Sequence, residues 1–188
     1  LKQNLGNHAS AIEDYSEALK INPKYEIAYY LRGFSKYSIK DFKGAIIDFS
    51  EALKINPKYE DALLNRGIAK TELNNFSGAI EDYSEIITMN PKNFAALELR
   101  GMNRNILKDY KNAINDFNKV IELDPNNYEA FGWRGNAKAE LKDYKNALKD
   151  LEQSLNINKN YLYAMELKSS IAEEINRENK IKVSNEIV

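Results

Sequence analysis

The chain has 188 residues, of which 43% are hydrophobic and 29% charged, with 27 Lys and Arg against 28 Asp and Glu. This composition fits one soluble domain or a short array and excludes collagen-like, disordered and disulfide-stapled proteins, the last because cysteine is absent. A net charge of -1 supplies no overall positive field for nucleic acid or an anionic membrane, and no apolar run approaches the roughly 20 residues that span a bilayer. We therefore expect neither a nucleic-acid partner nor membrane insertion.

A period of 34 residues organises the chain. All four prolines follow it, and so do four glycines that each come directly after an arginine. Alanines and aromatic residues recur with the same period, and we call each set of positions 34 residues apart a column. The proline and glycine columns are Pro23, Pro57, Pro91 and Pro125, and Gly33, Gly67, Gly101 and Gly135. So many matched columns indicate a tandem repeat.

Each repeat is predicted to form two helices with a short polar break between them, because apolar residues recur at helical spacing on both sides of the break. Asn or Asp before each proline ends the second helix, since the residue before proline is pushed out of the α region. A glycine inside a helix costs roughly 0.5 to 1 kcal/mol relative to alanine, so the glycine column predicts close approach of the paired helix. The residues predicted to cap the second helices are Asn7, Asp41, Asn75, Asp109 and Asp143.

Taken in chain order, the predicted elements begin and end with incomplete repeats. Residues 1–25 hold only the second helix of a partial repeat. The full repeats are residues 26–59, 60–93, 94–127 and 128–161. A C-terminal capping helix follows over residues 162–180, and residues 181–188 form a tail. The sequence starts at Leu1, without an initiator Met, and is expected to be part of a longer chain. The apolar side of Ile12, Tyr15 and Leu19 then lacks a first-helix partner, which leaves self-association through this open N-terminal end as an alternative role.

A 34-residue helix-turn-helix repeat with Gly, Ala, Tyr or Phe, Ala and Pro in this order resembles the tetratricopeptide repeat, and the resemblance covers essentially the whole chain. Departures occur where the family usually places a second small residue, which Ala18 and Ala52 keep and Ile86, Val120 and Ser154 do not. The resemblance implies an all-α, right-handed α-solenoid of tandem helix pairs. It also implies a scaffold that binds a protein or peptide segment in a concave groove.

The sequence contains no motif that is typical of a catalytic site. The only histidine, His8, occupies a column otherwise filled by Phe and Tyr, and we interpret it as a wedge between helices. No Gly-rich phosphate loop, His-Glu-x-x-His motif or Ser elbow occurs. We therefore expect no enzymatic activity, no cofactor and no bound metal.

Two charged columns run through the repeats. The basic column consists of Arg32, Arg66, Arg100 and Arg134, each followed four residues later by Lys or Arg, which places mildly repelling like charges on one helix face. The acidic column consists of Asp14, Asp48, Asp82, Asp116 and Asp150. We predict that the two columns meet as a ladder of partly buried ion pairs that sets repeat register. The alternative is a basic track that grips an acidic ligand.

The family resemblance also implies which side chains line the groove, namely the second, fifth, ninth and twelfth residues of each first helix. The groove residues predicted in this way, with Trp133 close by, are Ile27, Tyr30, Phe34, Tyr37, Asp61, Leu64, Ile68, Glu98, Met102, Asn105, Glu129, Trp133 and Asn136. The alternatives are neutral variation at solvent positions and packing against the next helix. The family's carboxylate clamp of paired Lys and Asn does not map here, because Asn65 and Asn136 lack the neighbouring Lys.

The predicted hot spot is the group Tyr30, Phe34 and Tyr37, whose spacings of four and three residues place them on one helix face. We expect an apolar or aromatic-bearing segment to dock there, with acidic residues further along the groove favouring basic residues in the rest of the ligand. The alternative is that a preceding helix covers this strip.

Overall fold

The computed structural model describes residues 2–186, with side chains described for residues 7–181, and this part of the chain is all-α. Its helices are α1 (Lys2–Ile21), α2 (Glu26–Ser38), α3 (Phe42–Ile55), α4 (Glu60–Glu72), α5 (Phe76–Met89), α6 (Phe94–Ile106), α7 (Tyr110–Leu123), α8 (Tyr128–Glu140), α9 (Tyr144–Ile157) and α10 (Leu162–Glu186). The chain divides into two compact units, unit 1 ending at Asn103 and unit 2 beginning at Arg104, and each is described by itself.

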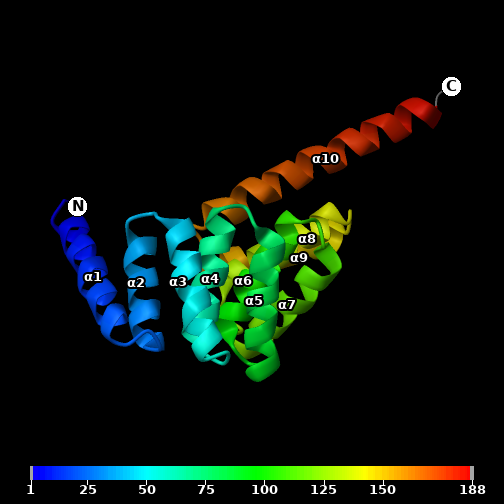
Figure 1. Ribbon diagram of the computed structural model, residues 1–188. Coiled ribbons are helices and arrows are strands. Elements are labelled where there is room, and N and C mark those ends of the chain that lie inside the picture. The colour runs from blue at the N-terminus through cyan, green and yellow to red at the C-terminus, as the bar shows by residue number, and fades with distance from the viewer. Residues whose placement is uncertain (1, 187–188) are drawn as a thin grey trace. The chain divides into compact units, whose positions relative to one another are not determined.

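Helices that follow one another along the chain pack side by side within each unit. In unit 1, α1 packs against α2, α2 against α3, α3 against α4 and α4 against α5 (Figure 1). In unit 2, α7 packs against α8, α8 against α9, and α10 against both α8 and α9. This is the tandem helix-hairpin packing of an α-solenoid, as the repeat pattern predicted.

The Asn-Pro and Asp-Pro pairs end the second helices as predicted. The helices α1, α3, α5 and α7 end at Ile21, Ile55, Met89 and Leu123, each one residue before such a pair. Asn56 shows the reason, because its backbone is extended, with φ -127° and ψ 90°.

The predicted helix caps are confirmed at three of five positions. Asp41 accepts a hydrogen bond from the backbone N–H of Gly44 at 2.9 Å, and Asn75 and Asp143 accept equivalent bonds at 3.1 and 3.4 Å. The prediction is wrong for Asp109, which accepts no backbone cap bond and accepts two hydrogen bonds from the side-chain amide of Asn112, at 2.9 and 3.0 Å. It is also wrong for Asn7, which lies inside α1, because that helix starts at Lys2.

The glycine column marks close approach of the paired helices, as predicted. A Cβ atom added at Gly67 would lie 2.5 Å from Cε1 of Tyr83, and one added at Gly33 would lie 2.9 Å from Cε1 of Phe49. In unit 2, a Cβ at Gly135 would lie 3.1 Å from the side chain of Leu151. The three facing side chains are fully buried, so these glycines allow the core aromatic and leucine residues to lie directly against the first helix.

The predicted ion pairs are confirmed for Arg32, Arg66 and Arg134. Arg66 donates two hydrogen bonds to the Asp82 carboxylate, at 2.7 and 3.0 Å, and Lys70 pairs with the same group at 2.8 Å. Arg66 also donates to Ser50 Oγ at 3.2 Å, so one guanidinium joins three helices. The same arrangement recurs at Arg32 and Asp48 and at Arg134 and Asp150. These guanidinium groups are therefore engaged within the fold and do not form a free basic track.

The last helix is longer than predicted. The sequence pattern placed its end near residue 180 and a tail after it, whereas α10 continues to Glu186. The stretch from Leu162 to Glu186 contains neither Pro nor Gly, so nothing in it breaks the helix.

Candidate functional site

The predicted groove residues of unit 1 lie on α2, α4 and α6 with unequal exposure. Ile27 and Phe34 are 43% and 44% exposed, which is high for large apolar side chains. Asp61 is also exposed, and the half-buried members are Leu64, Ile68, Glu98 and Met102. We call this side of the first helices the first-helix face.

Tyr30 differs from the other two members of the predicted hot spot. Its ring lies 5.0 Å from that of Tyr59 and 5.8 Å from that of Phe49, measured between centroids, and its hydroxyl accepts a hydrogen bond from Asn65 at 3.4 Å. Burial, followed by the nearby Asp61 carboxylate, raises the pKa of Tyr30. Tyr30 therefore contributes to packing between helices in addition to its exposed edge.

Phe34 and Tyr37 line a pocket of about 410 Å³, which we call the aromatic pocket. Its lining residues are Phe34, Tyr37, Ser38, Lys40, Phe42 and Glu72. The rings of Tyr37 and Phe42 meet at a centroid distance of 5.3 Å and an interplanar angle of 56°. The end of α2, the start of α3 and the end of α4 thus build one depression with aromatic walls.

The turn between α2 and α3 shapes the rim of this pocket. Lys40 adopts a left-handed backbone conformation with φ 64°, its N–H donates to Tyr37 O at 2.8 Å, and the N–H of Asp41 donates to Lys36 O at 2.9 Å. These bonds satisfy carbonyl groups at the end of α2 and reverse the chain into α3. The same left-handed turn recurs at the positions 34, 68 and 102 residues further on, occupied by Asn74, Lys108 and Lys142.

Glu72 provides the negative charge of the aromatic pocket. It is exposed and forms no hydrogen bond or ion pair with the residues that the structure describes. Burial of the Tyr37 ring, followed by the Glu72 carboxylate, raises the pKa of Tyr37. The pocket therefore combines apolar walls with an available carboxylate.

In unit 2, some of the predicted groove residues pack against other residues of the protein and others are exposed to solvent. Trp133 stacks at a tilt against Tyr163 of α10, with 4.8 Å between ring centroids, and its backbone O accepts a hydrogen bond from Asn105 at 3.0 Å. Asn105 is only 6% exposed, so its side chain is part of the core and not of a binding surface. Glu129 is exposed and Asn136 is half-buried.

A second pocket, of about 210 Å³, lies in unit 2 at positions equivalent to the aromatic pocket. It is lined by Ala139, Glu140, Lys142, Tyr144, Leu167, Ser170, Ile171 and Glu174. By the 34-residue period, Ala139 stands in the column of Tyr37, and Glu174 stands in the column of Glu72. Desolvation, followed by the nearby Glu174 carboxylate, raises the pKa of Tyr144 to about 12.

Models of known protein families match most of the chain. A model described as TPR repeat matches residues 4–40, and two models described as Tetratricopeptide repeat match residues 27–59, 95–127 and 128–161, and residues 61–93. The chain belongs to the tetratricopeptide repeat (TPR) family. It therefore has the fold of a family of protein-interaction scaffolds.

Solved TPR structures share this fold at low sequence identity. YrrB, described as a TPR protein with an unusual peptide-binding site, is 22% identical with a TM-score of 0.82, over 89% of this chain and 86% of YrrB. A TPR protein from Parabacteroides merdae ATCC 43184 is 22% identical with a TM-score of 0.81, over 97% and 73%. The first TPR of Spaghetti (RPAP3), bound to an HSP90 peptide, is 23% identical with a TM-score of 0.59, over 62% and 92%. No curated protein matches the chain.

Four residues of the TPR aromatic pocket were missing from the groove predicted from sequence, namely Ser38, Lys40, Phe42 and Glu72. They lie at helix ends and in a turn, whereas the family pattern points only to positions inside the first helices. Glu72 directly follows Thr71, the twelfth residue of its repeat, so extending the pattern by one residue would have included it.

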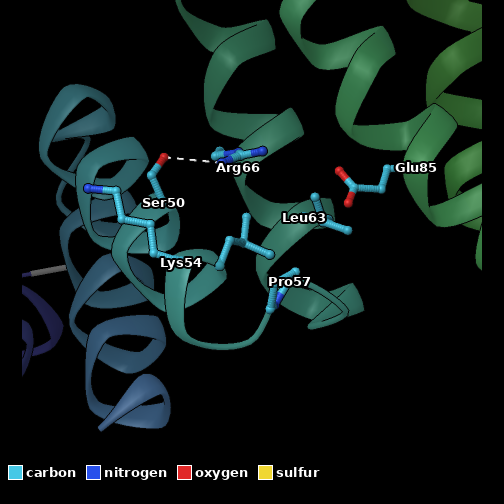
Figure 2. Close-up of a pocket in the computed structure, with 7 residues that line it drawn as sticks. Ser50, Lys54, Pro57, Leu63, Arg66 and Glu85 are labelled. Carbon is cyan, nitrogen blue, oxygen red and sulfur yellow. Dashed lines mark hydrogen bonds between the residues drawn. The ribbon is translucent and has the colours of Figure 1, made fainter. Parts of the chain in front are cut away.

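A third depression of the TPR array, of about 280 Å³, lies in unit 1 (Figure 2). Its polar groups are largely committed, because Arg66 binds Ser50 and Asp82 and Lys54 pairs with Glu51 at 2.6 Å. Its apolar lining comes from Leu53, Pro57 and Leu63. We therefore consider the aromatic pocket the stronger candidate site.

The described residues contain neither a metal site nor a membrane-spanning helix. Within residues 7–181, no group of three or more His, Asp or Glu side chains is placed to hold a metal ion. The helices between Lys2 and Glu186 include none that is both long and apolar enough to cross a membrane.

Proposed function

We propose that this TPR chain is a non-enzymatic scaffold that binds a peptide or protein segment on the first-helix face of unit 1, with the aromatic pocket as its principal contact. The observation that carries the proposal is the exposure of Phe34, at 44%, on the wall of a 410 Å³ pocket. A pocket that combines large aromatic side chains with a small set of polar and charged ones has the chemistry of a peptide-binding surface.

Comparison of the repeats with one another supports a role in binding. The column of Phe34 contains Ile68, Met102 and Asn136, and the column of Tyr37 contains Thr71, Asn105 and Ala139. The same helix pair therefore forms without aromatic residues at these positions. Phe34 and Tyr37 are not required by the fold, which favours a role in contact with a partner.

The remaining groove residues favour a ligand with basic residues. Asp61 is exposed on α4 of unit 1. Ile27 extends the apolar surface of α2 toward its first turn. These features support a segment that combines apolar and basic residues.

The role of YrrB and of the first TPR of Spaghetti (RPAP3) in peptide binding is a property of those proteins. Because they are only 22% and 23% identical to this chain, they provide a precedent for peptide binding by this fold and do not indicate a particular ligand.

Self-assembly is the second candidate function, and an observation on α10 favours it. Leu162 and Met165 are 63% and 46% exposed. Met165 stands in the column of Leu63 and Leu97, which are only 1% and 0% exposed. A second copy of the chain could cover this surface. Sedimentation velocity at increasing concentration tests self-association. The wild type should associate and Met165→Glu should remain monomeric. A wild-type chain that stays monomeric would exclude self-assembly.

Binding by the first-helix face is tested by a comparison of captured partners. Wild-type chain and the Phe34→Ala variant are used side by side to capture proteins from the source cell. The matched control is Ile47→Ala, which removes a 60% exposed apolar side chain from α3 outside the pocket. We expect a partner that the wild type and the control retain and that Phe34→Ala loses. Equal capture by all three would contradict the proposed site.

A further inference from the structure

We infer that the aromatic pocket selects a cationic side chain, Lys or Arg, from the bound segment. The inference rests on the proposed function and adds the chemistry of the group that enters the pocket. It is carried by the combination, at one depression, of three aromatic walls, two helix C-termini and a carboxylate that has no ion-pair or hydrogen-bond partner among the described residues.

The aromatic walls suit the stem and the charge of such a side chain. Phe34, Tyr37 and Phe42 present rings from α2 and α3, and two of these rings are tilted by 56° to one another. The aliphatic stem of Lys or Arg can pack on such rings while its charge interacts with their negative faces. A neutral aliphatic side chain gains only the first of these contributions.

Glu72 supplies the second attraction. Among the described residues it has no ion-pair or hydrogen-bond partner, and it lies close enough to Tyr37 to raise the pKa of that hydroxyl. A bound guanidinium or ammonium group would give this carboxylate a partner. A bound carboxylate would be repelled, which separates this pocket from sites that hold acidic peptide ends.

The helix ends act in the same direction. The last residue of α2, Ser38, and the last residue of α4, Glu72, both line the pocket. The aligned peptide dipoles of a helix leave a partial negative charge at its C-terminus, which stabilises a nearby cation. Two such ends at one depression favour a positive ligand group.

Lys40 is the one basic residue that lines the pocket, and it opposes the binding of a second cation. It is exposed and forms no ion pair within the described part of the chain. Its left-handed backbone is shared by Asn74 one repeat later, so Asn is accepted at this position. Lys40→Asn therefore removes the charge and keeps the turn.

The equivalent pocket of unit 2 lacks this combination. Asn136 and Ala139 stand at the positions of Phe34 and Tyr37, so two of the three aromatic side chains are missing there. We therefore assign the cation-selective site to unit 1 alone.

The experiment titrates the full chain with small probes and follows the side-chain NMR signals of Phe34, Tyr37 and Phe42. The cationic probes are Nα-acetyl-arginine amide and tetramethylammonium, and the neutral matched probes are Nα-acetyl-citrulline amide and Nα-acetyl-norleucine amide. We expect the cationic probes to bind at least about threefold more tightly than the neutral ones. Glu72→Gln should weaken binding of the arginine probe by about two- to fivefold, and Lys40→Asn should strengthen it by up to about twofold. Glu81→Gln, which removes an exposed carboxylate from α5, should leave it unchanged.

Equal affinity for the arginine and norleucine probes, or an arginine affinity that Glu72→Gln leaves unchanged, would overturn the cation assignment. Because the norleucine probe would then still shift the Phe34 signals, the proposed contact site would stand. Loss of partner capture by Phe34→Ala tests that contact independently, so failure of the proposed function and failure of the cation assignment give different results.

Discussion

Arg66 on α4 and Asp82 on α5 form a two-point ion pair, with N–O distances of 2.7 and 3.0 Å, around a carboxylate whose side chain is only 2% exposed. Ser50 on α3 accepts a third hydrogen bond from the same guanidinium. One side chain therefore connects the two helices of its own repeat and the second helix of the preceding one. Its position in a 34-residue column makes this connection a repeated feature of the array.

Arg66→Ala is expected to lower the free energy of unfolding by about 1 to 3 kcal/mol, because Asp82 stays buried with Lys70 as its remaining partner. Chemical denaturation measures the change. Lys54→Ala is the control, since it removes an exposed pair with Glu51 and should cost less than about 1 kcal/mol. Unaltered stability of Arg66→Ala together with lost partner binding would show that this column serves recognition.

Gly67→Ala should destabilise the chain by about 1 to 2 kcal/mol. The added methyl group would lie 2.5 Å from the buried ring of Tyr83, and this overpacking outweighs the better helix propensity of alanine. Gly135→Ala is the matched comparison, since its Cβ would lie 3.1 Å from the branched side chain of Leu151 and should cost less. Thermal unfolding followed by circular dichroism compares the two, and equal or reversed effects would contradict the packing described here.

Tyr83→Phe should leave the free energy of unfolding unchanged or raise it by up to about 1 kcal/mol. The Tyr83 hydroxyl is buried and has no hydrogen-bond partner among the described residues. Its removal therefore eliminates the free-energy cost of taking a polar group out of water without a new hydrogen bond. Phe49 occupies the equivalent position one repeat earlier, which shows that phenylalanine fits the site. The reciprocal change Phe49→Tyr should destabilise. A clear loss of stability in Tyr83→Phe would reveal a bond that this hydroxyl makes.

Alkaline pH should weaken the fold partly through the same residue. Burial, partly offset by a contact with the Thr71 hydroxyl that falls short of a hydrogen bond, raises the pKa of Tyr83 from 10.0 to about 12. The folded state therefore holds this proton more tightly than the unfolded state, and the resulting stability is present below pH 10 and lost as pH rises toward 12. Denaturation at pH 9 and pH 11 should show a smaller loss for Tyr83→Phe than for wild type. An identical loss in the two proteins would contradict the shift.

Much of the fold could be predicted from the sequence because the repeat is encoded in local signals. Asn56 before Pro57 ends α3 through the steric effect of proline on its neighbour, and this effect needs no tertiary contact. A glycine inside a helix, such as Gly67, predicts close packing against a neighbouring helix, and the ring of Tyr83 packs at this position. The 16-residue separation of Arg66 and Asp82 recurs in other repeats, which made their pairing visible as two parallel columns.

Other outcomes depended on side-chain geometry that residue type and spacing do not determine. Asp109 has the residue type of a cap, but its carboxylate accepts hydrogen bonds from the Asn112 side chain and none from the backbone. Asn105 has the spacing of a groove residue, yet it is buried against the backbone of Trp133. Neither outcome can be read from residue type and spacing.

The aromatic pocket illustrates the same limit at the candidate site. Phe34 and Tyr37 were predicted from their positions on one helix, whereas Phe42 and Glu72 join them only through the turn after α2 and the stacking of α4 on α2. The contribution of Glu72 therefore became visible only once the helices were placed in space.

The most direct test of the central claim is the dissociation constant of the captured partner for wild type, Phe34→Ala and Ile47→Ala, measured by titration calorimetry. Tyr37→Ala serves as a second pocket variant, and circular dichroism verifies that helical content is retained. The proposed contact predicts that each pocket variant weakens binding by about 1 kcal/mol or more, roughly a fivefold increase in the dissociation constant, while Ile47→Ala binds like wild type. Unchanged affinity in folded Phe34→Ala and Tyr37→Ala would contradict the assignment of the aromatic pocket as the partner-binding site.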